Sequence, residues 1–367
     1  MRIALRGVGV VGGFGCGVDD LRRTLIAGRC SPQTASVAGT EGAGEMPVFL
    51  ADTSRLAAFI PNRALRRVDH FSRLAALGAC LALEDARLPP TVRQALGLVI
   101  ATGYGATRTT FSFLDTVLDH GDACASPTFF SNSVSNAAAA HVSILLKITG
   151  PSLTVSQFEM SVPAALLTAC QWLEEKRVEG VLVGGVDEYC AVLGYSWQRF
   201  FGPGPTTGTR PLEWGRQSAI AGEGAAFFLL CRDEGDPPDY GFITDIRQGH
   251  LRHGGLDLAA DALLLLGADG HQACARRYAR HLPADARVAT YTPLYGSLPV
   301  GPAFDMAVAA LSIKAGRIFA PPPGAGENPG LKIVPRHARL DATPIRCLKF
   351  GREGEYAMVT LSGRGSI

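Results

Sequence analysis

The stretch from Gly150 to Gly185 decides the fold, and its sequence is GPSLTVSQFEMSVPAALLTACQWLEEKRVEGVLVGG. Its pattern predicts an apolar strand at Ser152–Ser156, a helix at Pro163–Arg177 and a second apolar strand at Gly180–Gly184. Two strands that are joined by a helix pair in parallel, because the connection must return to the same end of the sheet. This segment therefore predicts an α/β protein with a parallel sheet.

Further strands and helices are predicted on both sides of this segment. Before it we expect, in chain order, a strand at Ile3–Val11, helices at Val18–Ala27 and His70–Ala86, a strand at Leu96–Ala101, a helix at Thr107–Leu118 and a loop leading into an alanine-rich helix over Pro127–Leu146. After it we expect a strand at Ala225–Cys231, a strand at Gly241–Ile246, a helix at Leu258–Arg280, a strand at Ala286–Tyr291, a helix at Gly301–Ala315 and a strand at Tyr356–Leu361. The second series repeats the first in weaker form. We therefore expect two similar halves, residues 1–235 and 236–367, with the boundary in the charged stretch Arg232–Asp239.

Composition excludes several classes of partner. The chain has 367 residues, with 35 basic and 33 acidic side chains, so its net charge of +2 creates no long-range field for nucleic acid or an anionic membrane. No run of about 20 apolar residues predicts a membrane span. The nine cysteines are scattered without CxxC pairs, which favours reduced thiols and a cytoplasmic location over disulfides or a zinc site.

The glycines near the N-terminus and the eight histidines are the candidates for a cofactor or metal site. Gly7, Gly9 and Gly12 match G-x-G-x-x-G after a predicted strand, but no acidic residue follows at the distance that a ribose contact requires. The eight histidines include no HxxxH pair, and none lies at ligand spacing from a cysteine. We therefore predict neither a cofactor nor a metal ion.

Eight short motifs occur in order along the chain. They are Arg66-Arg67-Val-Asp69-His-Phe71-Ser72-Arg73, Thr102-Gly103-x-Gly105, Ser131-Asn-Ser-x-Ser-Asn136, Gly150-Pro-Ser-Leu-Thr-Val-Ser156, Gly184-Gly-Val-Asp-Glu188, Arg210-Pro211, Gly222-Glu-Gly-Ala225 and Phe350-Gly351-Arg-Glu-Gly354. Together they resemble the β-ketoacyl synthases of the thiolase superfamily, over nearly the whole chain. The resemblance implies an α/β protein with the thiolase-like five-layer αβαβα fold of two duplicated halves.

The residues that this family needs for condensation are missing at the matching positions. A family member carries a cysteine at the N-terminus of the helix after the Thr-Val-Ser strand, where the helix dipole favours the thiolate. Here Glu159 occupies that position, and a carboxylate cannot hold a stable acyl thioester. Ser297 stands in the place of the second catalytic histidine and Thr292 in that of the lysine. The first histidine has no counterpart, as though its segment were deleted between Tyr291 and Tyr295. The resemblance therefore predicts no catalytic residues for condensation.

Family members without the catalytic residues occur in type II polyketide synthases as the chain-length factor, or ketosynthase β subunit. This inactive subunit pairs with an active ketosynthase and shapes the tunnel for the growing acyl chain. The resemblance assigns the tunnel lining to Thr107, Thr110, Phe111 and Leu114, which are spaced along one helical face. It assigns the subunit interface to Phe129, Phe130, Asn132, Asn136, Thr154, Val155 and Ser156. Phe111 and Leu114 are equally consistent with a core role.

The sequence also departs from the family pattern, and these departures leave alternative functions open. Chain-length factors for aromatic products carry glutamine at the position of Glu159, and the shorter chain is closer to the factors for reduced, polyene-type products. Arg63, Arg66 and Arg67 either attract an acidic acyl carrier protein, as a transient partner, or form a solvated turn. One alternative function is a malonyl-carrier decarboxylase or acyltransferase that uses Glu159. Another is a stand-alone homodimer that binds an acyl carrier.

Overall fold

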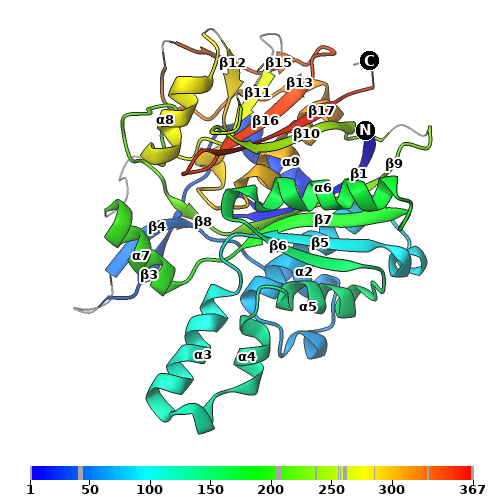
Figure 1. The fold of residues 1–367 in the computed structure, drawn as a ribbon, viewed down its shortest axis with the longest axis vertical. Helices are drawn as coiled ribbons and strands as arrows, with labels where there is room; N and C mark the ends of the chain where they lie inside the picture. The colour runs from blue at the N-terminus through cyan, green and yellow to red at the C-terminus, as the bar shows by residue number, and fades with distance from the viewer. Residues whose placement is uncertain are drawn as a thin grey trace.

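The computed structural model describes residues 2–39, 44–202, 208–235, 238–254, 256, 258, 263–284, 286–328 and 330–364. Figure 1 shows two groups of strands with a pair of helices between them and further helices on the outer faces. This arrangement is the five-layer αβαβα architecture that the sequence predicts. The domain boundary predicted after residue 235 remains a prediction, and residues 236 and 237 lie outside the described part.

The first group of strands comes from the N-terminal part of the chain. Its order is β6 (Ser152–Ser156), β5 (Gly97–Thr102), β7 (Gly180–Asp187), β9 (Gly224–Arg232) and β1 (Ile3–Gly12), with the short β2 (Gly15–Cys16) against β1. β6 and β7 run parallel, as the strand-helix-strand segment predicts, but they do not pair with each other, because β5 lies between them and pairs in parallel with both. β6 pairs with β5 alone within the described residues, so it is an edge strand.

The second group comes from the C-terminal part and is hydrogen-bonded to the first. Its order is β10 (Phe242–His250), β17 (Glu355–Ser362), β16 (Ile345–Phe350), β11 (Leu263–Leu266), β12 (Arg287–Ala289) and β14 (Lys332–Ile333). Ile3 of β1 is paired with Ile243 of β10, so the described strands of both groups make one continuous 12-stranded mixed sheet. The remaining short strands are β3 (Gln33–Val37), β4 (Gly44–Phe49) and β8 (Ala221–Gly222) in one small sheet, and β13 (Arg317–Ile318) and β15 (Ala338–Arg339) in another.

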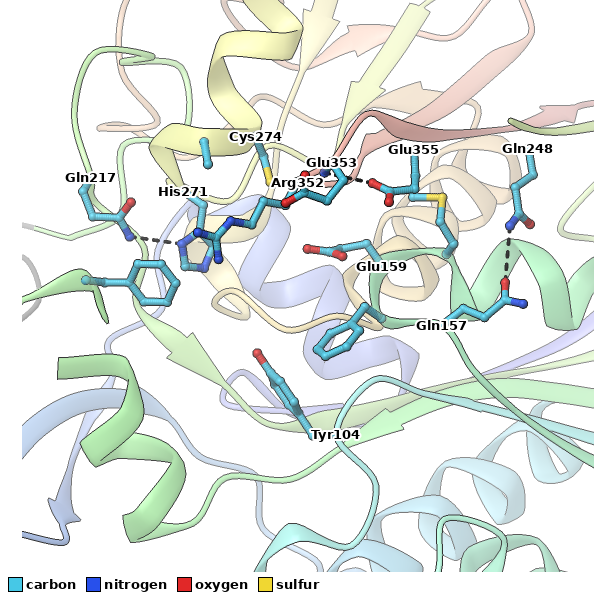
Figure 2. Close-up of a pocket in the computed structure, with 14 residues that line it drawn as sticks. Tyr104, Gln157, Glu159, Gln217, Gln248, His271, Cys274, Arg352, Glu353 and Glu355 are labelled. Carbon is cyan, nitrogen blue, oxygen red and sulfur yellow. Dashed lines mark hydrogen bonds between the residues drawn. The ribbon is translucent and has the colours of Figure 1, made fainter. Parts of the chain in front are cut away.

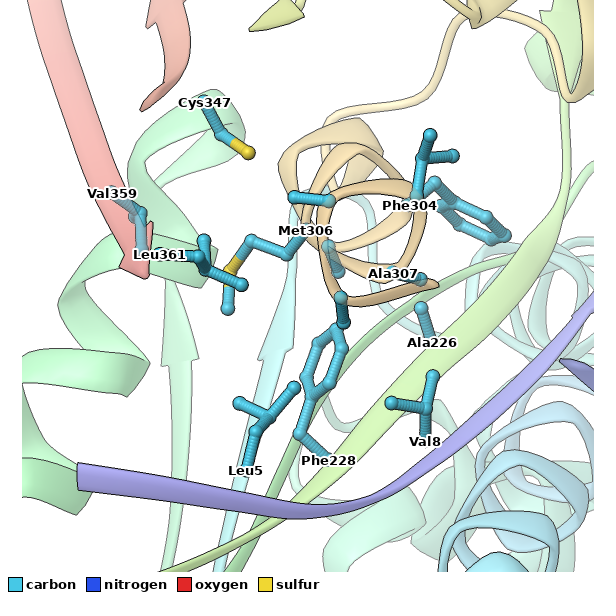
Figure 3. Packing of buried hydrophobic residues seen from close by; sticks show 14 of the residues in the cluster. Leu5, Val8, Ala226, Phe228, Phe304, Met306, Ala307, Cys347, Val359 and Leu361 are labelled. Atoms are coloured by element: carbon cyan, nitrogen blue, oxygen red, sulfur yellow. The ribbon is translucent and has the colours of Figure 1, made fainter. Parts of the chain in front are cut away.

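Two helices fill the space between the groups of strands. These are α6 (Ser161–Glu174) and α9 (Gly301–Ala315), and each contacts strands of both groups. α9 is buried from Gly301 to Ser312, and most of its side chains there are apolar. In Figure 3, Met306 of α9 lies beside Leu361 of β17, while Ala307 faces Ala226 of β9. This central layer is the largest apolar core of the molecule.

Other helices cover the outer faces. α2 (His70–Asp85) and α5 (Ala137–Leu146) pack on the first group of strands, and α8 (Gln272–His281) packs on the second. α2 approaches β1 very closely, because a Cβ atom on Gly9 would lie 2.1 Å from the carbonyl oxygen of Gly78. The glycines of the G-x-G-x-x-G pattern thus lie within a strand, and Gly7 and Gly9 allow tight packing of α2.

Three helices lie toward the ends of these layers. α1 (Val18–Ala27) follows β2, and α7 (Ala191–Phe201) packs on the small sheet of β3. α3 (Thr107–His120) and α4 (Pro127–Ser133) contact each other and project from the body as an arm (Figure 1). In the described residues no helix is both long and apolar enough to cross a membrane.

The structure differs from the sequence predictions at several elements, and α7, β3 and β4 are among those that were not predicted. The helix expected at Leu258–Arg280 is wrong, since this segment contains strand β11 and then α8, which begins only at Gln272. Strand β16 was not predicted, and it pairs in parallel with β11 and antiparallel with β17. The loop expected before the alanine-rich helix contains α4.

Candidate functional site

A cavity of about 630 Å³ opens where the end of β6 meets α8 and the β16–β17 turn. Its lining comes from distant parts of the chain: Tyr104, Gln157, Phe158, Glu159, Met160, Phe201, Gln217, Gln248, His271, Ala273, Cys274, Arg352, Glu353 and Glu355. Figure 2 shows side chains from these segments converging on one space. Within the described residues, no three histidine, cysteine or acidic side chains are grouped as a metal ion requires.

Glu159 is held in the cavity by a sharp turn between β6 and α6. The backbone of Phe158 has φ +48°, a left-handed conformation that is rare for a phenylalanine. The hydroxyl of Ser161, the first residue of α6, stabilises this turn, because it accepts from the Gln157 N–H at 2.7 Å and lies 2.7 Å from the Phe158 carbonyl oxygen. The half-buried Glu159 faces the cavity, and its carboxylate has no hydrogen bond or ion pair to the described residues.

Tyr104 enters the cavity from the loop after β5. Buried Asp187 fixes this loop, because its carboxylate accepts from the N–H groups of Gly103 and Tyr104 and from the Thr102 hydroxyl. Burial raises the pKa of Asp187 to about 6, against these hydrogen bonds. The Tyr104 ring meets the Phe158 ring edge-on, with 6.0 Å between ring centroids. Burial also raises the pKa of Tyr104, so its hydroxyl stays protonated and can donate into the cavity.

His271 forms the opposite wall of the cavity, and its tautomer follows from its neighbours. The Gln217 carbonyl oxygen accepts from the Gln272 N–H at 3.0 Å, so its amide nitrogen, 3.1 Å away, is a donor to Nδ1 of His271. A neutral imidazole that accepts at Nδ1 carries its proton on Nε2. Burial lowers the pKa of His271, although the Asp269 carboxylate opposes the shift. His271 is therefore a neutral donor at neutral pH.

Ser297 and Thr292 do not reach the cavity. Both are buried, and the Ser297 hydroxyl donates to Asp269 at 2.9 Å while the Thr292 hydroxyl donates to the Ala268 carbonyl at 2.6 Å. Lys349 of β16 donates to the same Asp269 carboxylate at 2.9 Å. Burial alone would raise the pKa of Asp269, but the Lys349 ammonium lowers it to about 2. Ser297 and Thr292 thus hold the loop after β11 in place.

The loop after β11 lies beside Ser297, because the Asp269 carboxylate accepts from the Ser297 hydroxyl and the Gly267 carbonyl accepts from Lys349. The absence of the first-histidine segment remains a prediction. The loop after β11 was not predicted because the apolar pattern assigns the surrounding residues to one helix. Asp269, His271 and Lys349 were not predicted either, and their only signal was that each follows or ends an apolar run.

The expected tunnel residues lie on the projecting arm, away from the cavity lining. Phe111 and Leu114 belong to one exposed side of α3, which Leu118 continues with 80% of its surface accessible. Thr107 is at the start of the same side. Thr110 differs, because its hydroxyl lies 2.8 Å from the Ala106 carbonyl and 3.1 Å from the Ser133 carbonyl of the adjoining segment. Thr110 therefore ties α3 to α4.

The expected interface residues divide into exposed and buried groups. Phe129 and Phe130 are exposed on α4, and Asn136 is exposed just before α5. Thr154, Val155 and Ser156 lie on edge strand β6. Asn132, however, is buried: its amide donates to the Arg67 carbonyl at 2.9 Å, and its oxygen lies 2.9 Å from His141 Nε2. Within the chain Asn132 therefore fixes α4, and its place at the interface stays a prediction.

A buried polar network anchors the base of the arm. Glu223 accepts from the Tyr189 N–H at 2.9 Å and contacts His70 at 3.1 Å, while Glu188 accepts from the Arg108 N–H at 2.8 Å. Burial raises the pKa of Glu188 to about 8. Burial would also raise the pKa of Glu223, but His70 and the backbone donors lower it. The motifs that contain Glu188 and Glu223 thus hold α3 on the body.

Comparison with known proteins places this site in context. Residues 1–235 match the family model of the beta-ketoacyl synthase N-terminal domain. The chain is 26% identical over 242 residues to the 3-oxoacyl-[acyl-carrier-protein] synthase 2 of Coxiella burnetii, and 26% identical over 233 residues to nodulation protein E of Rhizobium meliloti. Each match covers 62% of this chain and 57% of the relative, so the chain matches little more than half of either protein.

Solved structures resemble the chain over its whole length. The ishigamide ketosynthase/chain length factor has a TM-score of 0.83 at 19% identity, with 99% of each chain covered. A beta-ketoacyl synthase from Burkholderia phymatum has a TM-score of 0.81 at 16% identity, with the same coverage. The complex of AntDE with AntF, a type II polyketide acyl-carrier protein with its ketosynthase, has a TM-score of 0.77 at 15% identity, again with 99% of each chain covered. At these identities the likeness establishes the thiolase-like fold.

Proposed function

The chain belongs to the β-ketoacyl synthase family, and from this membership we propose that it is the inactive chain-length factor of a type II polyketide synthase. In this role it pairs with an active ketosynthase in the cytoplasm and shapes the tunnel for the acyl chain, here of a reduced, polyene-type product. The observation that carries the proposal is Glu159, a carboxylate on the sharp turn where the family carries its cysteine.

Condensation needs a thiolate to accept the acyl chain and donors that stabilise the enolate of the extender unit. The attack of a carboxylate on a thioester would give a reactive anhydride, which cannot store the chain. Ser297 and Thr292 already donate to Asp269 and to the Ala268 carbonyl, so neither hydroxyl proton is available to a substrate. The chain thus keeps the scaffold of the family without its condensing chemistry.

The exposed side of α3 supports the tunnel role. Phe111, Leu114 and Leu118 present an apolar stripe that nothing in the described part of the chain covers fully. A growing acyl chain that leaves the partner's active site would meet such a stripe if the arm lay across the subunit boundary. The stripe favours a floor for an apolar chain over a core role, because Leu114 and Leu118 are exposed.

Edge strand β6 and its neighbours supply a surface for the partner ketosynthase. Ser152–Ser156 contains neither a charged residue nor a proline that would protect an exposed edge. Exposed apolar side chains lie on β6 and on the helices that contact it: Leu153 of β6, Ile144 of α5 and Leu167 of α6, with Phe158 shortly after the strand. Phe129 and Phe130 are exposed on α4, which contacts α5. An active ketosynthase of the same fold would present an equivalent strand, and pairing of the two strands would continue the sheet.

Arg63, Arg66 and Arg67 support a transient contact with an acidic acyl carrier protein. All three are exposed on or beside the 3₁₀-turn Asn62–Leu65, near the base of the arm. Several cations on one turn would steer an acidic carrier toward the subunit boundary. The alternative, a solvated turn, predicts that their removal leaves carrier binding unchanged.

Intact-protein mass spectrometry tests the proposal. The chain would be mixed with acylated and malonylated carrier protein, with and without a candidate ketosynthase that has its Cys-His-His residues. We expect only the ketosynthase to gain the acyl mass. If this chain became acylated, one of its cysteines would be the nucleophile and the proposal would fail. Loss of carbon dioxide from malonyl carrier with this chain alone would support the decarboxylase alternative.

Light scattering of the purified chain distinguishes a chain-length factor from the remaining alternative, a stand-alone homodimer that binds an acyl carrier. A chain-length factor should be monomeric or poorly soluble alone and should form a one-to-one complex with its ketosynthase. A stand-alone carrier-binding protein should instead be a stable homodimer that gains nothing from the ketosynthase.

A further inference from the structure

We propose that the cavity around Glu159 is a thioester hydrolase site, in which Glu159 activates water and Tyr104 and His271 bind the thioester carbonyl oxygen. The inference goes beyond the proposed function, since a chain-length factor needs no chemistry of its own. The inference can also fail while the proposed function holds, because hydrolysis can be measured on this chain alone.

Glu159 has the properties of a general base. Its carboxylate has no partner among the described residues, although the side chain is half-buried, so both oxygens remain available to accept a proton. The tight turn at Phe158 and the Ser161 hydroxyl hold it in position. The cavity is open to solvent beside exposed Phe158, so water can reach the carboxylate.

Two donors face the same space as the carboxylate. Figure 2 shows the Tyr104 hydroxyl and the His271 ring pointing toward the region in front of Glu159. Asp187 fixes the loop of Tyr104, and the Gln217 amide fixes the His271 ring with its proton on Nε2. Burial keeps the tyrosine protonated and the imidazole neutral, so each can donate at neutral pH. Oriented donors of this kind stabilise an oxyanion.

The cysteine in the lining does not compete for the acyl group. Cys274 is 4% exposed, and burial raises the pKa of its thiol to about 12, so it stays protonated and weakly nucleophilic. The cavity thus offers a thioester a base and donors without a thiolate that would retain the acyl chain. Water is then the nucleophile that the geometry favours.

The step balances without a further reactant. Glu159 takes a proton from water as the water oxygen forms a bond to the thioester carbon. The negative charge that develops on the carbonyl oxygen is stabilised by Tyr104 and His271. The carbon–sulfur bond then breaks, and the thiolate takes the proton from Glu159. The products are a carboxylic acid and a free thiol, and Glu159 returns to its starting state.

The test measures thiol release from acetyl and octanoyl thioesters of N-acetylcysteamine by the purified chain, alone and in complex with a ketosynthase. Glu159→Gln keeps the size of the side chain and removes the base, so we expect the rate to fall about 100-fold. Tyr104→Phe keeps the ring and removes the hydroxyl donor, and His271→Phe replaces the imidazole by an aromatic ring without a donor; we expect each variant to lose about tenfold or more. Glu174→Gln, at the exposed far end of α6, is the matched control and should retain the full rate.

Each outcome decides the inference. Support requires thiol release by the wild-type chain that Glu159→Gln loses, together with a solvent deuterium isotope effect that reports the proton transfer. The absence of turnover, or equal rates for the wild type and Glu159→Gln, overturns it. Acylation of this chain during turnover, detected by mass spectrometry, also overturns it, because the nucleophile would then be a side chain. Thermal unfolding curves verify that the variants fold.

Discussion

Glu188 is an unusual residue for the base of a projecting arm, because it is 1% exposed and one carboxylate oxygen has no hydrogen-bond partner in the described chain. Its other oxygen accepts from the Arg108 N–H, which fixes the first turn of α3. A carboxyl group in this position is more stable in its neutral form. The protonation of Glu188 therefore makes the stability of the fold at the base of the arm depend on pH.

A pH dependence of stability follows from Glu188. Its pKa is raised to about 8 in the folded chain, against an ordinary value of 4.5, so the unfolded chain loses this proton first as pH rises. The contribution of Glu188 to stability is complete below pH 4.5 and is lost as pH rises toward 8. Glu188→Gln should remove this slope and be more stable than the wild type at pH 8 by about 1–3 kcal/mol.

Urea unfolding of both proteins across that pH range measures the difference. Glu174→Gln, an exposed glutamate on α6, serves as the control and should give a curve parallel to the wild type. Parallel curves for Glu188→Gln and the wild type would show that the carboxyl group titrates normally in the fold.

The candidate site could be predicted only in part from single residues. Glu159 was identified because the strand and helix around it fix its distance from Gly150. Asp269, Ser297 and Lys349 could not be grouped, because the ion pair and hydrogen bond between them join three separate elements. The burial of Asn132 could not be predicted for a similar reason, since its partners Arg67 and His141 meet it only in the folded chain.

At the scale of elements, the periodicity of apolar residues predicted helices correctly where a helix buries one side or is fully buried. The ranges expected for α1 and α9 agree with the structure. It failed at β11, because the four leucines follow an alanine-rich stretch and were joined with the residues of α8 into one helical pattern across Gly267 and Gly270. β16 was missed because Arg346 and Lys349 interrupt its apolar run, and only burial with Asp269 explains a lysine there.

The apolar side of α3 leads to a prediction for the product. Phe111→Ala or Leu114→Ala would deepen a tunnel that ends on this helix, so the complex with a ketosynthase should release longer chains. Mass spectrometry of the released products measures the shift. Thr116→Ala is the control, because Thr116 lies on the opposite side of α3 and its hydroxyl bonds to the Phe113 carbonyl. An unchanged distribution in both variants would place the tunnel elsewhere.

At the scale of the whole molecule, one sheet continues from the N-terminal strands into the C-terminal strands and ends at β6. α6 and α9 cover the inside of both groups, and α2, α5 and α8 cover the outside. The edge at β6 is thus bordered by exposed apolar side chains and has no protecting charge. Such an edge favours association with another strand over exposure to water.

We therefore expect a mutation on β6 to weaken the association of the whole chain with its partner. Leu153 is 41% exposed on this strand, and Leu153→Glu would place a charge in the partner's apolar surface without disturbing a buried contact. We expect the complex with the ketosynthase to weaken at least about tenfold, while the thermal stability of the isolated chain stays unchanged. Sedimentation of the mixed subunits measures the affinity.

The chain offers a matched control for this change. Ile26 is 49% exposed on α1, and α1 packs on β1, which is separated from β6 by β9, β7 and β5. Ile26→Glu introduces the same charge on an exposed apolar residue, so it should leave the complex intact. If both variants bound the ketosynthase as the wild type does, β6 would not be the interface. If both weakened it equally, net charge rather than the β6 edge would govern association.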